Sequence, residues 1–68
     1  MRTEKEIMQD ILYCYVLLSP ENIWRDGEAT KAEAAYTERR YKDRLRKLFV
    51  ELGRNVSEEE AYNSTGEY

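Results

Sequence analysis

The residues best equipped for chemistry in this 68-residue chain are cations concentrated in one short stretch. Such a surface can neutralise phosphates while Tyr36 or Tyr41 stacks on bases. It can equally bind an acidic protein surface. It can also remain solvated, with internal pairs such as Glu38 with Lys42 and Asp43 with Lys47. Six cations fall within nine positions and are opposed there only by Asp43: Arg39, Arg40, Lys42, Arg44, Arg46 and Lys47.

Groups suited to catalysis are scarce in the rest of the chain. There is no histidine, and the single Cys14 lies in an apolar run, so an ordinary zinc site and an intrachain disulfide are both excluded. Glu58, Glu59 and Glu60 are adjacent, point in different directions and are better explained as the start of a helix. Acid–base and nucleophilic catalysis need positioned partners that this composition does not offer. We therefore expect a protein that is not an enzyme and has no cofactor or metal.

The basic cluster must be positioned by a long amphipathic helix, Lys31–Leu52. Thr30 and Glu33 make a capping box at its start, and Gly53 suits the left-handed residue that ends a helix. Glu38 interrupts the apolar side of this helix. Either it lies near the edge and reaches solvent, or it is buried and needs a tyrosine or arginine partner. At 100° per residue one stripe collects the apolar positions Ala34, Tyr41, Leu45, Leu48, Phe49 and Leu52.

An earlier helix, Glu4–Leu18, begins at a second capping box made by Thr3 and Glu6. Its segment Ile11–Leu18 is apolar almost all round, and one partner helix covers only one side of it. A chain this short gains only about 3–5 kcal/mol from its core and usually needs an additional source of stability. We therefore expect a homodimeric bundle, or a face that binds another protein. The self-association residues expected are Ile11, Leu12, Tyr15 and Val16.

The segment between the two helices is expected to reverse the chain. Ser19-Pro20 favours a single new turn of helix, and Asp26-Gly27 is a turn signal. Trp24 in this loop is either a recognition anchor or a plug for the open end of the helical hairpin, because buried tryptophans often dominate interfaces.

The C-terminal part is expected to add a short third helix. Ser57 and Glu60 form a third capping box, so the helix should run from Glu58 to about Tyr62. Residues 63–68 are expected to form a frayed tail. The sequence thus predicts one helical domain over residues 1–62.

The chain shows no sign of a membrane or secretory destination. One unpaired cysteine in an apolar run fits a reducing compartment. The run Ile11–Leu18 is too short to span a bilayer, and its acidic flank argues against a signal peptide. We expect a cytoplasmic protein that does not bind membranes.

Four short runs resemble segments of a group of small bacteriophage accessory proteins, which are helical hairpins of unassigned role. The Ile23-Trp24-Arg25 insert departs from that group. The resemblance implies a context in which compact phage proteins bind and block host machinery, including antiviral defence. The runs are Tyr13-Cys14-Tyr15, Leu18-Ser19-Pro20-Glu21-Asn22, Asp26-Gly27-Glu28 and Leu52-Gly53-Arg54-Asn55-Val56-Ser57-Glu58.

Together these observations predict an all-α fold, an antiparallel helical hairpin with a short third helix. The function expected is a non-enzymatic protein-binding module that inhibits or redirects a host protein complex. A small nucleic-acid-binding regulator that uses the basic face is the alternative, and a structural scaffold is a third class. The partner-binding residues expected are Trp24, Tyr36, Arg39, Arg40, Lys42, Arg46 and Lys47.

Overall fold

Helices alone make up the regular structure of residues 2–65, the part of the chain that the computed structural model describes. This confirms the all-helical fold. Across those residues, no helix is both long and apolar enough to cross a membrane. The elements in order are α1 (Glu4–Leu17), α2 (Pro20–Ile23), the 3₁₀ turn η1 (Arg25–Gly27), α3 (Lys31–Leu52) and α4 (Glu58–Thr65).

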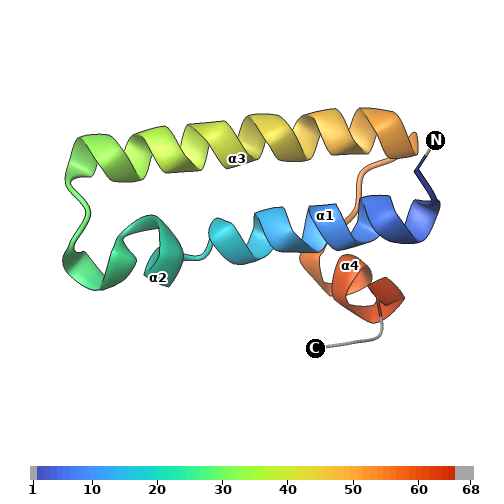
Figure 1. Cartoon of the computed structure of the whole chain (residues 1–68), viewed down its shortest axis with the longest axis horizontal. Coiled ribbons are helices and arrows are strands. Elements are labelled where there is room, and N and C mark those ends of the chain that lie inside the picture. Colours follow the sequence, from blue (N-terminus) through green and yellow to red (C-terminus); the bar gives the residue numbers. More distant parts are fainter. Residues whose placement is uncertain (1, 66–68) are drawn as a thin grey trace.

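Helix α1 is packed on two sides. Figure 1 shows α3 running antiparallel along α1 and α2, while α4 lies against α1 on the side away from α3. The expectation that only one helix of the chain covers α1 was therefore wrong. Ile11 of α1 and Ala61 of α4 are both fully buried, so the second cover comes from the same chain.

The four residues expected to mediate self-association have different environments. Ile11 and Leu12 are 0% and 3% exposed within the single chain. Tyr15 is half-buried against the core, and Val16 is 39% exposed. Ile11 and Leu12 therefore offer no surface to a second copy, contrary to expectation, because α3 and α4 already cover α1.

Both long helices begin at the residues expected from local signals, and α3 also ends where expected, whereas α1 ends at Leu17, one residue before the expected Leu18. At α1, the Glu6 amide donates to the Thr3 hydroxyl at 3.2 Å and the Thr3 amide donates to the Glu6 carboxylate at 3.0 Å. At α3, the corresponding distances between Glu33 and Thr30 are 3.1 and 3.0 Å. Gly53 ends α3 with φ of +93°, a conformation that an L side chain rarely adopts.

The chain reverses between α2 and α3 through three successive residues with positive φ. Arg25, Asp26 and Gly27 have φ values of 47°, 56° and 90°, so the turn expected at Asp26-Gly27 begins one residue earlier. The Arg25 side chain pairs with Glu33 at 2.8 Å. This contact joins the loop to the first turn of α3.

Helix α4 packs against α1 through apolar contacts, and one hydrogen bond holds the segment that leads into α4 against α1. Val56 and Ala61 are 3% and 0% exposed. The Tyr15 hydroxyl donates to the Val56 carbonyl at 2.5 Å. The Glu60 amide donates to the Ser57 hydroxyl at 3.1 Å, but the Glu60 carboxylate pairs with Arg54 instead of completing the capping box.

Helix α4 also runs past its expected end at Tyr62. It continues to Thr65, whose side chain is buried and whose hydroxyl donates to the Tyr62 carbonyl at 3.0 Å. Residues 63–65 are therefore helical, contrary to the expected tail. Residues 66–68 of that tail lie outside the described residues.

Candidate functional site on the outer face of helix α3

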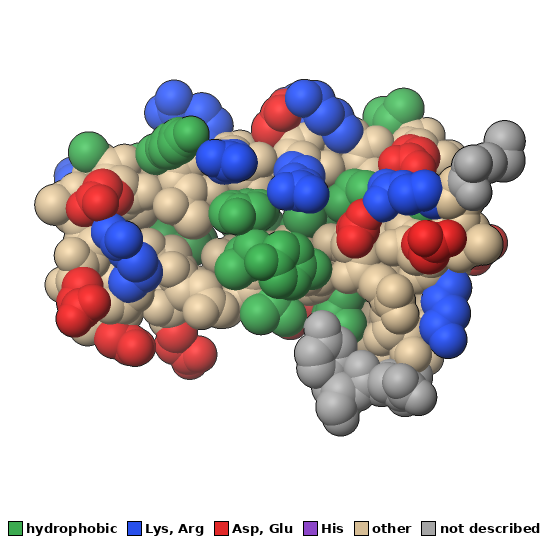
Figure 2. All heavy atoms as spheres, viewed as in Figure 1, with side chains coloured by type: hydrophobic (Ala, Val, Ile, Leu, Met, Phe, Trp, Pro, Cys, Tyr) green, Lys and Arg blue, Asp and Glu red, His purple; other side chains and the backbone are tan. Residues whose placement is uncertain are grey.

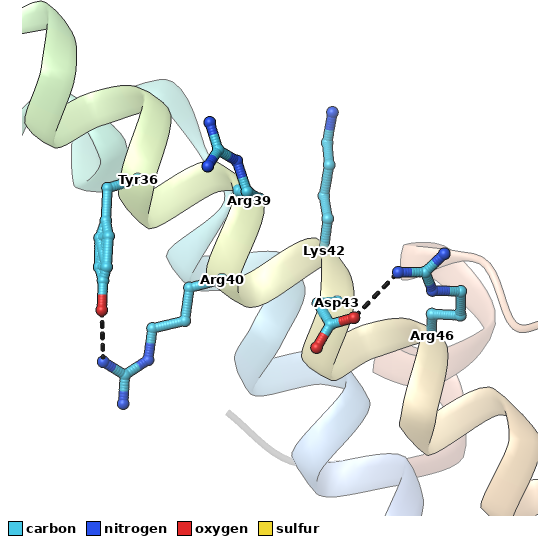
Figure 3. A pocket seen from close by; sticks show the side chains of 6 residues that line it. All are labelled: Tyr36, Arg39, Arg40, Lys42, Asp43 and Arg46. Carbon is cyan, nitrogen blue, oxygen red and sulfur yellow. Dashed lines mark hydrogen bonds and ion pairs between the residues drawn. The ribbon is translucent and has the colours of Figure 1, made fainter.

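Helix α3 separates the basic cluster into two neighbouring stripes, because residues three or four apart lie on the same side of a helix. Figure 3 shows Arg39 and Lys42 projecting to one side of α3 and Tyr36 and Arg40 to the other. We call them the Arg39 stripe (Arg39, Lys42 and Arg46) and the Tyr36 stripe (Tyr36, Arg40, Asp43 and Lys47).

Two carboxylates partly neutralise these stripes. The Asp43 carboxylate forms ion pairs with Lys47 at 3.1 Å and with Arg46 at 2.9 Å. The Lys47 and Arg46 hydrogen bonds hold the pKa of Asp43 below its ordinary value, so its carboxylate stays charged. Glu38 pairs with Lys42 at 3.0 Å on the solvent side, which confirms its expected exposed position. The internal pairs anticipated from the sequence therefore form, but exposed pairs of this kind are weak.

Positive charge nonetheless remains in excess on α3. Arg39 and Arg44 form no ion pair within residues 2–65, and Arg40 contacts only the neutral Tyr36 hydroxyl, at 3.4 Å. Residues 36–47 hold six cations and two carboxylates, a net charge of +4, in a chain whose net charge is −3. The other residues together therefore carry −7. The molecule has a pronounced separation of charge.

The arginine nearest α1 does not belong to either stripe. Arg44 acts electrostatically on the Cys14 thiol, which is 1% exposed. Burial raises the pKa of that thiol, and the nearby Arg44 only partly opposes the rise. Cys14 is therefore a packed apolar group and a poor nucleophile. Residues 2–65 also place no three histidine, cysteine, aspartate or glutamate side chains where they would hold a metal ion.

Trp24 is 44% exposed at the end of α2. It lines an open depression that we call the Trp24 groove. Two groove residues, Ala35 and Glu38, lie on α3 within one turn of Arg39 and Lys42. Trp24 therefore lies on the same side of the molecule as the Arg39 stripe. Tyr36 belongs to the other stripe and does not lie on that side. The groove residues are Leu18, Pro20, Ile23, Trp24, Lys31, Ala34, Ala35 and Glu38.

One apolar residue that the sequence did not single out, Val50, also reaches this surface, as does the expected Tyr36. Val50 is 78% exposed, four residues beyond Arg46 on the outer side of α3. Tyr36 is 55% exposed and lines a second groove with Leu17 and Tyr41. Figure 2 shows one face on which hydrophobic side chains gather between α1 and α3, with Lys and Arg side chains above them on α3. The signal missed was an apolar residue, Val50, on the charged side of an amphipathic helix.

No protein-family model matches the chain, and comparisons with curated proteins and with solved structures give no match. The function must therefore be inferred from the chemistry of this surface.

Proposed function

We propose that the chain is a non-enzymatic binding module that docks the outer face of α3 on an acidic surface of a partner protein. The observation that carries the proposal is the uncompensated charge of +4 over residues 36–47. Arg39 is the strongest candidate for direct contact, because it is exposed and has no ion-pair partner within residues 2–65. Complementary charge raises the association rate and selects the partner.

A protein partner fits this face better than a nucleic acid. Tyr36 and Val50 are exposed beside the cations, and protein interfaces are enriched in tyrosine and arginine. The same concentration of arginine beside exposed Tyr36 favours nucleic acid as the second candidate.

The setting proposed for this module rests on the resemblance to small bacteriophage accessory proteins. In that setting it acts in the cytoplasm of the host and inhibits or redirects a host protein complex, such as an antiviral defence system, by occupying its surface. We also propose a homodimer. Exposed Tyr13 and Val16, at 53% and 39%, support an apolar contact along the outer side of α1.

The test reverses one charge on the site and one elsewhere. Tagged parent chain and the Arg39→Glu and Lys5→Glu variants are expressed in bacteria and purified with their bound proteins. Both variants change the net charge equally, and Lys5 is exposed on α1 without an ion pair in the described part of the chain. We expect a partner to co-purify with the parent and with Lys5→Glu, and to be lost with Arg39→Glu.

Nucleic-acid binding is measured in parallel with single-stranded and duplex oligonucleotides. We expect affinities no tighter than about micromolar at physiological salt, the level of non-specific binding. Submicromolar, sequence-tolerant binding that falls steeply with salt and is lost in Arg39→Glu would establish the second candidate instead.

A further inference from the structure

Two features that are separate in the sequence form one continuous surface. The Trp24 groove ends at Ala35 and Glu38, and the next turn of α3 begins the Arg39 stripe. The Glu38 carboxylate pairs with Lys42 at 3.0 Å, which links the groove to the stripe. Lys31 lines the opposite end of the groove. The surface therefore has an apolar depression with cations at both ends.

We propose that this surface binds an acidic amphipathic helix of the partner protein, with one apolar side chain in the Trp24 groove and carboxylates along the Arg39 stripe. The inference deepens the proposed function and rests on it. Its basis is complementary charge: Lys31 and the Arg39 stripe supply four cations. Glu38 pairs with Lys42 and Asp43 pairs with Arg46, which leaves Lys31 and Arg39 without a carboxylate partner within residues 2–65. A partner helix with acidic residues on one side supplies the missing counter-charges.

The spacing of the cations specifies the partner helix. Arg39, Lys42 and Arg46 follow Ala35 by four, seven and eleven residues on α3. At 1.5 Å per residue, they lie about 6, 10.5 and 16.5 Å along the helix axis. A helix packed alongside α3 has the same rise. Its acidic residues are therefore expected four, seven and eleven positions from its apolar anchor.

The lining of the groove favours a side chain over a nucleotide base. Besides Trp24, the groove offers mainly aliphatic groups, including Ile23 and Ala35. Glu38 also lines the groove, and its negative charge disfavours a phosphate there. A tryptophan that is 44% exposed beside a groove is also the type of residue that anchors protein interfaces.

Two synthetic helical peptides of identical composition test the proposal. The matched peptide carries one leucine anchor and glutamates four, seven and eleven positions after it. In the rotated peptide each glutamate is moved by two positions, which turns it about 200° around the helix. Neither peptide contains tryptophan, so emission reports on Trp24, the single tryptophan of the chain. Binding is followed by this fluorescence and by calorimetry.

We expect the matched peptide to bind about tenfold more tightly than the rotated one and to shift Trp24 emission to shorter wavelength, a difference of about 1.4 kcal/mol. Arg39→Glu should weaken the matched peptide about tenfold or more, whereas Lys5→Glu should change it less than about twofold. Ala35→Gln fills the groove without changing charge and should also weaken binding. Ala32→Gln, at an alanine that is also exposed but lies outside the groove, is its control.

Three results would overturn the inference. Equal affinity for both peptides without a change in Trp24 emission means that charge alone is recognised, and the proposed function then stands without the groove. If the matched peptide does not bind at about millimolar concentration, an acidic helix is excluded as the ligand of this surface. If an oligonucleotide binds more tightly than the matched peptide and quenches Trp24 fluorescence, both the inference and the proposed function are wrong. Circular dichroism of each variant confirms that the helices are retained.

Discussion

Replacing Tyr15 by phenylalanine removes one hydroxyl that holds the segment leading into α4 against α1. The hydroxyl donates to the Val56 carbonyl at 2.5 Å, and Val56 is 3% exposed. The aromatic ring and its apolar contacts are retained, so the change isolates the hydrogen bond. Leaving a buried carbonyl without its donor costs about 1–3 kcal/mol. A chain of this size has a free energy of unfolding of only about 3–5 kcal/mol from its core, so this loss is a large fraction.

The same hydroxyl predicts a pH dependence at the alkaline end. Burial raises the pKa of Tyr15, and the Glu58 carboxylate raises it further. The neutral phenol is therefore favoured in the folded chain. Its contribution to stability is complete below the unfolded tyrosine pKa of about 10 and is lost as pH rises through the higher folded pKa. The stability difference between the parent and Tyr15→Phe should narrow above about pH 10.

Urea unfolding followed by far-ultraviolet circular dichroism measures both effects. We expect Tyr15→Phe to lower the midpoint with an unchanged slope. Tyr13→Phe removes a hydroxyl from the same helix at a position that is 53% exposed, and it should change stability by less than about 0.5 kcal/mol. If Tyr15→Phe costs less than about 0.5 kcal/mol, or if Tyr13→Phe costs as much, the hydroxyl does not hold α4 in place.

Three further outcomes are expected from the local structure. Thr30→Ala should lower stability by about 1 kcal/mol in urea unfolding through loss of the helix cap, and a value within error would mean that α3 does not depend on it. Gly53→Ala should cost about 1 kcal/mol or more because φ there is +93°, and a neutral result would mean that the turn rearranges. Light scattering after gel filtration should show a parent homodimer that Val16→Asp dissociates into folded monomers, whereas Leu12→Asp should unfold the chain because Leu12 is 3% exposed. A folded parent that is monomeric at micromolar concentration would contradict the dimer.

Helix ends could be predicted because their signals are local. Thr30 and Glu33 are three residues apart, so their reciprocal hydrogen bonds depend on almost nothing outside the first turn. Gly53 ends α3 for an equally local reason, the low cost of positive φ without a Cβ. The presence of all the helices followed from such signals together with apolar periodicity.

The docking of α4 could not be predicted in the same way. It depends on contacts between residues about forty positions apart, such as the Tyr15 hydroxyl with the Val56 carbonyl. Nothing in the local pattern around Ser57 indicates which helix it covers. The extra turn to Thr65 depends on burial of the Thr65 side chain, to which its hydroxyl adds a local hydrogen bond to the Tyr62 carbonyl. The composition of this segment is otherwise typical of a tail.

The candidate site was predicted in part. Periodicity placed the cations on the outer side of α3, and their exposure in the structure agrees. Their division into two stripes also follows from periodicity. Which of the two stripes lies beside the Trp24 groove depends on where the fold places Trp24. That position is set by a reversal in which Arg25 and Asp26 both adopt positive φ, a conformation that non-glycine residues seldom take. Three-dimensional placement of Trp24 therefore required the structure.

The cover that α4 provides changes what a dimer must use. Ile11 and Leu12 were expected at the interface because α1 is apolar on more sides than one helix covers, yet both are buried inside the single chain. A second copy that contacted them would first have to displace α4 and break the bond between Tyr15 and Val56. The outward residues Tyr13 and Val16 need no such opening. A dimer that leaves α4 in place must therefore form through the outer side of α1.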